Sequence, residues 1–182
     1  MESHKLKWGI LATGNIANQF ARDLRFCEAS ELVAVASRCK ERATHFANEH
    51  GARWVFDDYE QLVKSEAIDI VYIATPHHLH YDNAMLCLEH GKHVLVEKPM
   101  TLSAELTSRL FQTAKAKGLF LMEALWTRFI PAIQVALKQV ETGRIGQPRH
   151  LISDFGFKCE RDPQHRLFNQ EYGGGSDRKS VV

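Results

Sequence analysis

The chain has 182 residues, 45% of them apolar and 25% charged, and its 23 basic side chains balance 22 acidic ones. These values are typical of a folded globular protein and exclude a strongly charged binder of nucleic acid or membrane surfaces. The four cysteines lack the close spacing of a zinc site or a redox motif, and no stretch resembles a signal peptide or a membrane span. We therefore expect a cytoplasmic protein with free thiols and with neither nucleic acid nor membrane as a partner.

Short apolar runs recur along the first two thirds of the chain. They lack the two-residue alternation of strands that have one solvent-exposed face, so they are typical of strands buried on both faces of a parallel sheet. The runs lie at residues 8–12, 32–36, 53–56, 70–74, 94–96 and 119–122.

Amphipathic helices are predicted between these runs. Gly51, Gly91 and Gly118 each follow a helical stretch and precede a strand, where a left-handed backbone is expected. Ser103 is the expected N-cap of the helix that precedes Gly118. This alternation of strand and helix predicts an α/β fold, a doubly wound parallel sheet with right-handed crossovers.

The pattern changes after residue 122. A helix is predicted over residues 127–142, with Pro131 in its first turn, and a strand of a different sheet over residues 149–157. We expect residues 1–125 to form one complete domain and residues 126–176 to begin a second, incomplete α+β domain. Residues 177–182 fit no pattern, and we expect them to be a non-native tail.

The first strand leads into the sequence ATGNIA at residues 12–17 and directly into a helix. This is the dinucleotide-binding turn G-x-G-x-x-G/A with Ala12 in place of the first glycine. Gly14 is the position where the backbone must approach a pyrophosphate, and the helix N-terminus supplies free N–H groups. The alternative is a tight strand-to-helix turn that binds no ligand.

The second strand ends at Ser37 and Arg38, where an NAD site usually has a carboxylate for the ribose hydroxyls. A hydroxyl followed by a guanidinium suits a 2′-phosphate instead, and Lys40 and Arg42 add positive charge nearby. The residues therefore favour NADP over NAD. Ordinary surface charges at the start of a helix are the alternative.

Two further strand ends carry candidate residues. Thr75 and Pro76 begin a loop that contains three histidines, but no carboxylate stands at metal-ligand spacing, so a loop beside the cofactor is favoured over a metal site. Glu97 and Lys98 end a later strand, where the ammonium group can orient a nicotinamide and polarise a substrate hydroxyl or carbonyl. The alternative for this pair is an exposed Glu–Lys pair before a loop.

Together these segments resemble the glucose–fructose oxidoreductase / inositol dehydrogenase (Gfo/Idh/MocA) family. The matching pieces are WGILATGNIA, VASR, ATPHHLH, VEKP and a later GGG, so that the resemblance extends from about Lys7 to Ser176. The segments FLMEALWTRFIPA and RLFNQEYGGG are similar to the branch that contains dimeric dihydrodiol dehydrogenase and D-xylose dehydrogenases.

The resemblance implies a role for each candidate residue. Lys98 is the implied catalytic lysine, and Trp126, Arg128 and Phe155 are implied to approach the substrate. The implied cofactor-binding residues are Ala12, Thr13, Gly14, Asn15 and Ile16 for the pyrophosphate, Ser37 and Arg38 for the adenosine phosphate, and Thr75, Pro76, His80, Glu97 and Lys98 for the nicotinamide side.

The function implied by the resemblance is NADP-dependent transfer of hydride between the nicotinamide and a C–OH group of a sugar or a trans-dihydrodiol. In the family, an aspartate and then a tyrosine or histidine follow the GGG run and exchange the proton. The chain ends before such a pair, so we expect this fragment to show little turnover and to lack the open sheet through which the parent protein forms a homo-oligomer. A non-catalytic NADP-binding module is the alternative function.

Overall fold

The structure, a computed structural model, describes residues 5–152, 154, 156, 158–160, 162–164, 167–169 and 172. It divides the chain into two compact units, Met1–Ala124 and Leu125–Val182.

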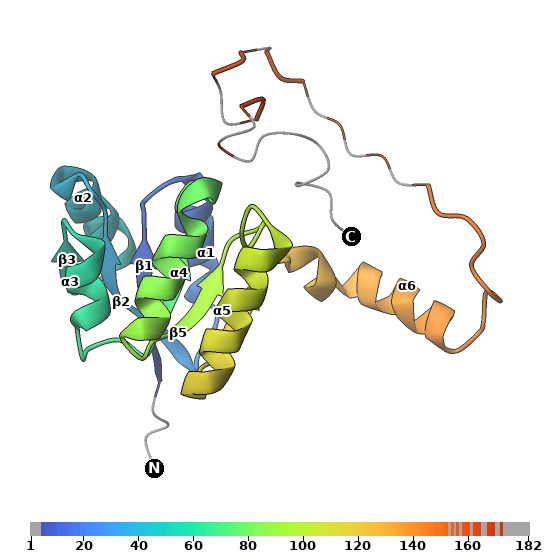
Figure 1. Ribbon diagram of the computed structural model, residues 1–182, viewed down its shortest axis with the longest axis horizontal. Coiled ribbons are helices and arrows are strands. Elements are labelled where there is room, and N and C mark those ends of the chain that lie inside the picture. Colours follow the sequence, from blue (N-terminus) through green and yellow to red (C-terminus); the bar gives the residue numbers. More distant parts are fainter. Residues whose placement is uncertain are drawn as a thin grey trace. The chain divides into compact units, whose positions relative to one another are not determined.

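Six parallel strands form one sheet in the first unit, in the order β3-β2-β1-β4-β5-β6 (Figure 1). The strands are β1 (Leu6–Leu11), β2 (Ser30–Ala36), β3 (Trp54–Phe56), β4 (Ile70–Ile73), β5 (His93–Val96) and β6 (Leu121–Glu123). β1 pairs with both β2 and β4, so the strand order reverses between β1 and β4. The predicted doubly wound parallel sheet is confirmed.

Helices cover both faces of this sheet, as the continuous apolar character of the strands requires. They are α1 (Asn15–Leu24), α2 (Lys40–His50), α3 (Tyr59–Lys64), the 3₁₀ turn η1 (His77–Leu79), α4 (His80–Glu89) and α5 (Ala104–Lys117). One apolar cluster joins the sheet to α1 and α2, and a second joins its other face to α3, α4 and α5 (Figure 1).

The predicted helix ends are confirmed. Gly51, Gly91 and Gly118 have φ angles of 81°, 73° and 65°, the left-handed conformation that glycine adopts without steric cost. The hydroxyl oxygen of Ser103 accepts a hydrogen bond of 3.2 Å from the N–H of Leu106 and caps α5.

The second unit differs from the sequence-based prediction. A short 3₁₀ helix, η2 (Trp126–Phe129), comes first, and α6 (Pro131–Glu141) begins at the proline, so the predicted helix start at residue 127 is wrong. The reason is local, because the residue before a proline disfavours the helical conformation and Ile130 is extended, with φ −68° and ψ 124°.

The strand predicted over residues 149–157 is also absent from the described residues of that segment, which are 149–152, 154 and 156. A strand needs a neighbour to satisfy its backbone groups, and the described part of this unit contains no other strand. No helix among the described residues is long and apolar enough to cross a membrane.

Candidate functional site

The sequence-predicted residues of the first unit meet at the carboxyl edge of the sheet. Backbone hydrogen bonds continue past the strand ends and align the next residue of each strand with its neighbour. These bonds run from Ala12 N to Ala36 O, Ser37 N to Phe56 O, Ala74 N to Leu11 O, Glu97 N to Ile73 O and Ala124 N to Val96 O, at 2.7–3.1 Å. Parallel α/β sheets bind ligands along this edge.

The turn after β1 has the geometry of a phosphate-binding loop. Ala12, in the first glycine position of the motif, has φ +76°, a left-handed conformation that glycine favours. Gly14 precedes α1 with an ordinary φ of −74°, and a Cβ atom placed on it would meet no atom within 4 Å. The turn therefore leaves open space where a pyrophosphate would approach the N-terminus of α1, and the residues present fit that group.

The end of β2 offers a hydroxyl and a guanidinium. Ser37 is buried, and its side-chain oxygen accepts a hydrogen bond of 3.3 Å from the N–H of Cys39. Arg38 is exposed. Burial raises the pKa of Tyr59, whereas the positive charge of Arg38 acts in the opposite direction. The guanidinium of Arg38 thus lies near the phenol of Tyr59.

Two side chains of α4 hold the loop after β4. The amide nitrogen of Asn83 donates to the hydroxyl oxygen of Thr75 at 3.1 Å, and both residues are buried. His80 is fully buried, with Nε2 2.8 Å from the carbonyl oxygen of Thr75 and Nδ1 2.8 Å from that of Pro99. Burial lowers the pKa of His80, against the opposing effect of the two carbonyls and of Glu97 and Glu123. His80 therefore links the Thr75 loop to the segment that carries Lys98.

The segment from Glu97 to Met100 is held by side chains from two neighbouring strands. The hydroxyl of Tyr72 on β4 donates to Oε1 of Glu97 at 2.6 Å, and the N–H of Met100 donates to Oε1 of Glu123 at 2.6 Å. The Lys98–Pro99 peptide bond is cis, and Lys98 is half-buried. The residues before and after the lysine are thus fixed, which limits the positions that its ammonium group can take.

Tyr72, Asn83 and Glu123 were not predicted from the sequence. A signal existed for Tyr72, because a tyrosine in a strand buried on both faces needs a partner for its hydroxyl. Asn83 is buried on α4 and Glu123 is half-buried at the end of β6, and a polar side chain in such a place needs a partner. The sequence did not show which partner each would find.

The predicted substrate residues lie in the second unit. Trp126 is 61% exposed and shares η2 with Arg128, whereas Phe155 lies outside the described residues. Their role in substrate binding stays a prediction. Among the described residues, no group of three or more His, Cys, Asp or Glu side chains is arranged to hold a metal ion.

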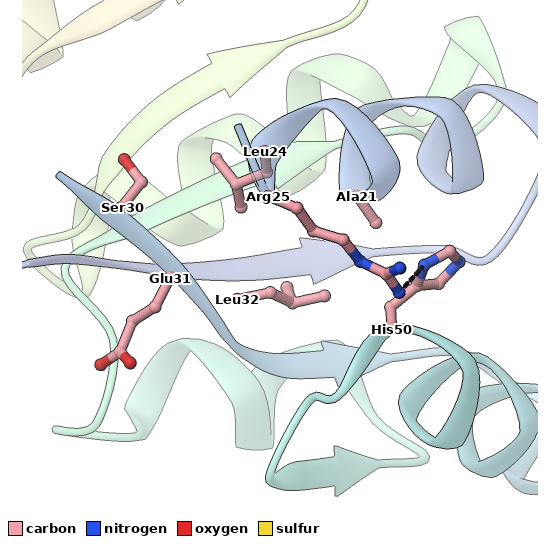
Figure 2. Close-up of a pocket in the computed structure, with 7 residues that line it drawn as sticks. All are labelled: Ala21, Leu24, Arg25, Ser30, Glu31, Leu32 and His50. Atoms are coloured by element: carbon pink, nitrogen blue, oxygen red, sulfur yellow. Dashed lines mark hydrogen bonds between the residues drawn. The ribbon is translucent and has the colours of Figure 1, made fainter. Parts of the chain in front are cut away.

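A cavity of about 120 Å³ lies at the opposite edge of the sheet, between the ends of α1 and α2 and the start of β2 (Figure 2). It is smaller than the roughly 300 Å³ at which small-molecule pockets begin. Its lining comprises Ala21, Leu24, Arg25, Ser30, Glu31, Leu32 and His50. Because of its small volume, this cavity is not a candidate dinucleotide site.

Known proteins share this sequence pattern. Residues 6–125 match the Gfo/Idh/MocA family, described as an oxidoreductase family with an NAD-binding Rossmann fold. Mouse trans-1,2-dihydrobenzene-1,2-diol dehydrogenase is 39% identical over 93% of this chain and 51% of its own length. D-xylose 1-dehydrogenase (NADP(+)) of Hypocrea jecorina is 38% identical over 95% of this chain and 49% of its own. The chain thus spans about half the length of these curated relatives.

Solved structures share the fold. A 3-ketoreductase from Actinomadura kijaniata, solved in complex with NADP, is similar with a TM-score of 0.73 and 31% identity over 79% of this chain and 46% of its own. Apo scyllo-inositol dehydrogenase from Lactobacillus casei gives a TM-score of 0.75 and 27% identity over 80% of this chain and 44% of its own.

Proposed function

Because the chain belongs to the Gfo/Idh/MocA family of oxidoreductases with an NAD-binding Rossmann fold, we propose that the protein is an NADP-dependent dehydrogenase acting on CH–OH groups. The observation that carries this proposal is the alignment of Ser37, Ala12, Ala74 and Glu97 along one edge of the sheet by continuous backbone hydrogen bonds. This alignment brings a phosphate-binding turn, a candidate 2′-phosphate site and a lysine to the same side of the molecule.

NADP is the proposed cofactor because of the chemistry at the end of β2. The guanidinium of Arg38 is exposed and offers the planar set of donors that a phosphate accepts, whereas Ser37 and Arg38 place no carboxylate there for a ribose diol. Two relatives support this choice, since the xylose dehydrogenase is NADP-dependent by name and the 3-ketoreductase was solved with NADP.

Lys98 is the proposed catalytic residue. When bound, the nicotinamide supplies or accepts the hydride; the protein has to place the substrate oxygen and stabilise its developing charge. An ammonium group on a segment fixed at Glu97 and Met100 can donate a hydrogen bond to that oxygen with little reorganisation. Thr75, Pro76 and His80 form the proposed wall on the nicotinamide side, and Trp126, Arg128 and Phe155 remain proposed substrate contacts.

The proposed substrate class is a sugar or a trans-dihydrodiol. The names of the two curated relatives support these two classes. An exposed aromatic side chain such as that of Trp126 can stack on the apolar face of a sugar or on a benzenoid ring. A cytoplasmic location and a homo-oligomeric parent protein are part of the same proposal.

A fluorescence titration of the chain with NADPH and with NADH tests the cofactor assignment. We expect saturable binding of both with a preference for NADPH, and Arg38→Ala should weaken NADPH binding by about ten- to a hundredfold while leaving NADH unchanged, since a hydrogen bond to a charged group is worth about 1.5–3 kcal/mol. Arg109→Ala on α5 is the matched control, because that arginine is exposed and pairs with Glu105 one turn earlier on its own helix. Equal binding of both dinucleotides by wild type and Arg38→Ala would overturn the NADP assignment.

Activity assays separate an enzyme from a binding module. In a version of the protein that extends over the full length of its relatives, Lys98→Met should abolish oxidation of D-xylose and of trans-dihydrodiols while NADPH still binds. Full activity of this variant would contradict the assigned role of Lys98, and NADPH binding without any turnover in the wild type would favour the non-catalytic module.

A further inference from the structure

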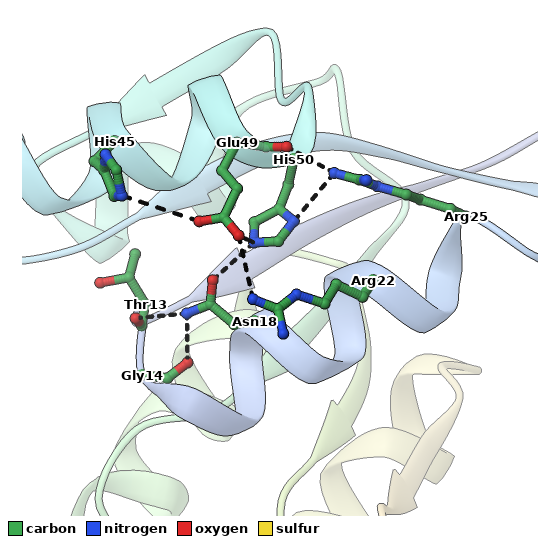
Figure 3. Close-up of polar contacts among 8 residues, drawn as sticks. All are labelled: Thr13, Gly14, Asn18, Arg22, Arg25, His45, Glu49 and His50. Carbon is green, nitrogen blue, oxygen red and sulfur yellow. Dashed lines mark hydrogen bonds and ion pairs between the residues drawn. The ribbon is translucent and has the colours of Figure 1, made fainter.

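A continuous chain of hydrogen bonds connects the two ends of α1 through a side chain of α2 (Figure 3). Arg25, the C-cap of α1, places its guanidinium 3.3 Å from Nδ1 of His50, the last residue of α2. Nε2 of His50 lies 2.7 Å from Oδ1 of Asn18. The amide nitrogen of Asn18 in turn lies 3.0 Å from the carbonyl oxygen of Gly14 and 3.3 Å from that of Thr13.

The chemistry of these groups fixes the direction of every bond. A guanidinium can only donate, so Nδ1 of His50 must accept and the ring hydrogen must sit on Nε2. That N–H donates to Oδ1 of Asn18, which leaves the amide nitrogen facing the two carbonyls. A flipped Asn18 amide would put oxygen against carbonyl oxygen, so the tautomer of His50 determines the orientation of Asn18.

The surroundings of His50 favour this neutral tautomer. The side chain of His50 is only 1% exposed, and its ring packs at 4.4 Å from that of Phe46. Burial lowers the pKa of His50, and the charges of Arg25 and Arg22 act in the same direction, whereas Glu49 opposes them. Glu49 is itself paired with Arg22 at 3.3 Å and lies 4.0 Å from His45. Arg25 reaches His50 across the cavity between the ends of α1 and α2 (Figure 2).

The two carbonyl groups that accept from Asn18, those of Thr13 and Gly14, belong to the phosphate-binding turn. In a planar trans peptide the C=O and N–H groups point in opposite directions. Holding the carbonyls of Thr13 and Gly14 toward Asn18 therefore points the N–H groups of Gly14 and Asn15 away from it. The backbone N–H of Asn18 also donates to the Gly14 carbonyl at 3.0 Å, so the side chain is the additional constraint on the Thr13 carbonyl. The N–H groups of Gly14 and Asn15 are the donors that a pyrophosphate at a helix N-terminus requires.

We propose that Asn18 and His50 are positioning residues of the dinucleotide site, and that the chain from Arg25 to Asn18 aims the N–H groups of Gly14 and Asn15 at the pyrophosphate. This inference rests on the proposed function, because it needs a dinucleotide at the turn. It adds a specific expectation, since the pyrophosphate is common to NADPH and NADH. Loss of these hydrogen bonds weakens the binding of NADPH and of NADH by the same factor, whereas loss of Arg38 weakens the binding of NADPH alone.

The test measures NADPH and NADH affinity together with the melting temperature for a set of matched variants. Asn18→Leu removes both hydrogen bonds to the turn at similar volume and should weaken both dinucleotides about five- to thirtyfold, the equivalent of one to two hydrogen bonds. His50→Phe should weaken both by about fivefold. His50→Gln, whose amide can accept from Arg25 and donate to Asn18, should restore binding to near the wild-type level.

Gln19→Ala is the matched control, because Gln19 is an amide on the same helix that donates to the exposed carboxylate of Asp23. Its affinities should equal those of the wild type. Nitrogen-15 NMR of labelled histidine gives an independent readout on the unmodified chain, in which His50 should carry its hydrogen on Nε2 at neutral pH.

The outcomes separate the two proposals. If the wild type binds both dinucleotides and Asn18→Leu binds them equally well, or if His50→Gln is as impaired as His50→Phe, the positioning role is wrong and the proposed function stands. A hydrogen on Nδ1 of His50 would likewise overturn the positioning role. If a folded wild type binds neither dinucleotide, the proposed function fails, and the positioning role fails with it.

Discussion

The hydroxyl of Tyr72 lies 2.6 Å from Oε1 of Glu97 and connects the core of the sheet to the segment that carries Lys98. Tyr72 is 2% exposed, and the ring of Phe20 stacks on it with 3.9 Å between ring centroids. Burial raises the pKa of Tyr72 above its ordinary value, and the charge of Glu97 raises it further. The hydroxyl therefore stays protonated and donates, so that Glu97 has one favoured orientation.

Tyr72→Phe keeps the stacked ring and removes only this donor. We expect the free energy of unfolding to fall by about 1–2 kcal/mol, the usual value for a hydrogen bond to a charged group that is partly exposed to solvent. Urea denaturation measures the change, and Tyr81→Phe on α4 serves as the control for loss of a half-buried hydroxyl. A stability equal to that of the wild type would show that the Tyr72–Glu97 bond contributes nothing.

Ala12→Gly should stabilise the chain or leave it unchanged, although glycine usually destabilises. The φ of +76° at Ala12 costs an L-residue roughly 1–2 kcal/mol, while glycine loses about 0.5–1 kcal/mol more on folding through its greater freedom in the unfolded chain. The net expectation is a gain of between zero and about 1.5 kcal/mol, seen as an unchanged or higher melting temperature. Ala17→Gly, inside α1 and fully buried, is the control and should lower it.

Ala12 also shows how far the sequence analysis could reach. The succession of strands and helices along the sequence, the turn at residues 12–17 and the strand ends that carry Ser37, Thr75 and Glu97 follow from local patterns, because each depends on neighbours in the chain. The left-handed backbone at Ala12 could be expected from its place in the motif, since the turn needs it whichever residue stands there.

Contacts between distant segments could not be read in this way. His50 and Asn18 are 32 positions apart, and Glu123 meets Met100 across 23 positions. A polar side chain at a buried position needs a hydrogen-bond partner, and the sequence indicates this need. The partner itself is supplied only by the packing of α1 on α2 or of β5 beside β6. The predicted start of the last helix failed for the opposite reason, because a local rule at Pro131 was given too little weight.

Acid should destabilise the chain in a defined pH range. Burial lowers the pKa values of His50 and His80 below the ordinary histidine value of 6.5, so the unfolded chain binds protons at a higher pH than the folded chain does. The contribution of these two histidines to the free energy of unfolding is therefore constant above about pH 7 and falls as the pH drops below about 6.5, by up to about 1.4 kcal/mol per pH unit for each histidine. Each contribution levels off below the folded pKa of that histidine.

Urea denaturation between pH 8 and pH 5 measures this slope. The pKa values of Glu41, Glu49 and Glu60 are lowered below 4.5. Protonation of these glutamates therefore destabilises the fold only at a pH below the range in which the histidines titrate. His50→Gln should reduce the slope by the share of one histidine. A slope that this variant leaves unchanged would mean that His50 does not titrate in this range.

Two glycines of the first unit should respond in opposite ways to the same substitution. In Gly9→Ala the new Cβ would lie 3.0 Å from the side chains of both Ile68 and Leu62 in the core, so we expect a loss of about 1–3 kcal/mol in unfolding free energy. In Gly14→Ala the Cβ meets nothing within 4 Å, and the φ of −74° suits alanine, so the melting temperature should hardly change.

The open space at Gly14 is where we place the pyrophosphate, and the added methyl group should weaken NADPH and NADH binding by at least about tenfold. Melting curves and dinucleotide titrations on both variants test this contrast, and a Gly14→Ala variant with wild-type affinity would show that the dinucleotide does not approach the turn at this residue.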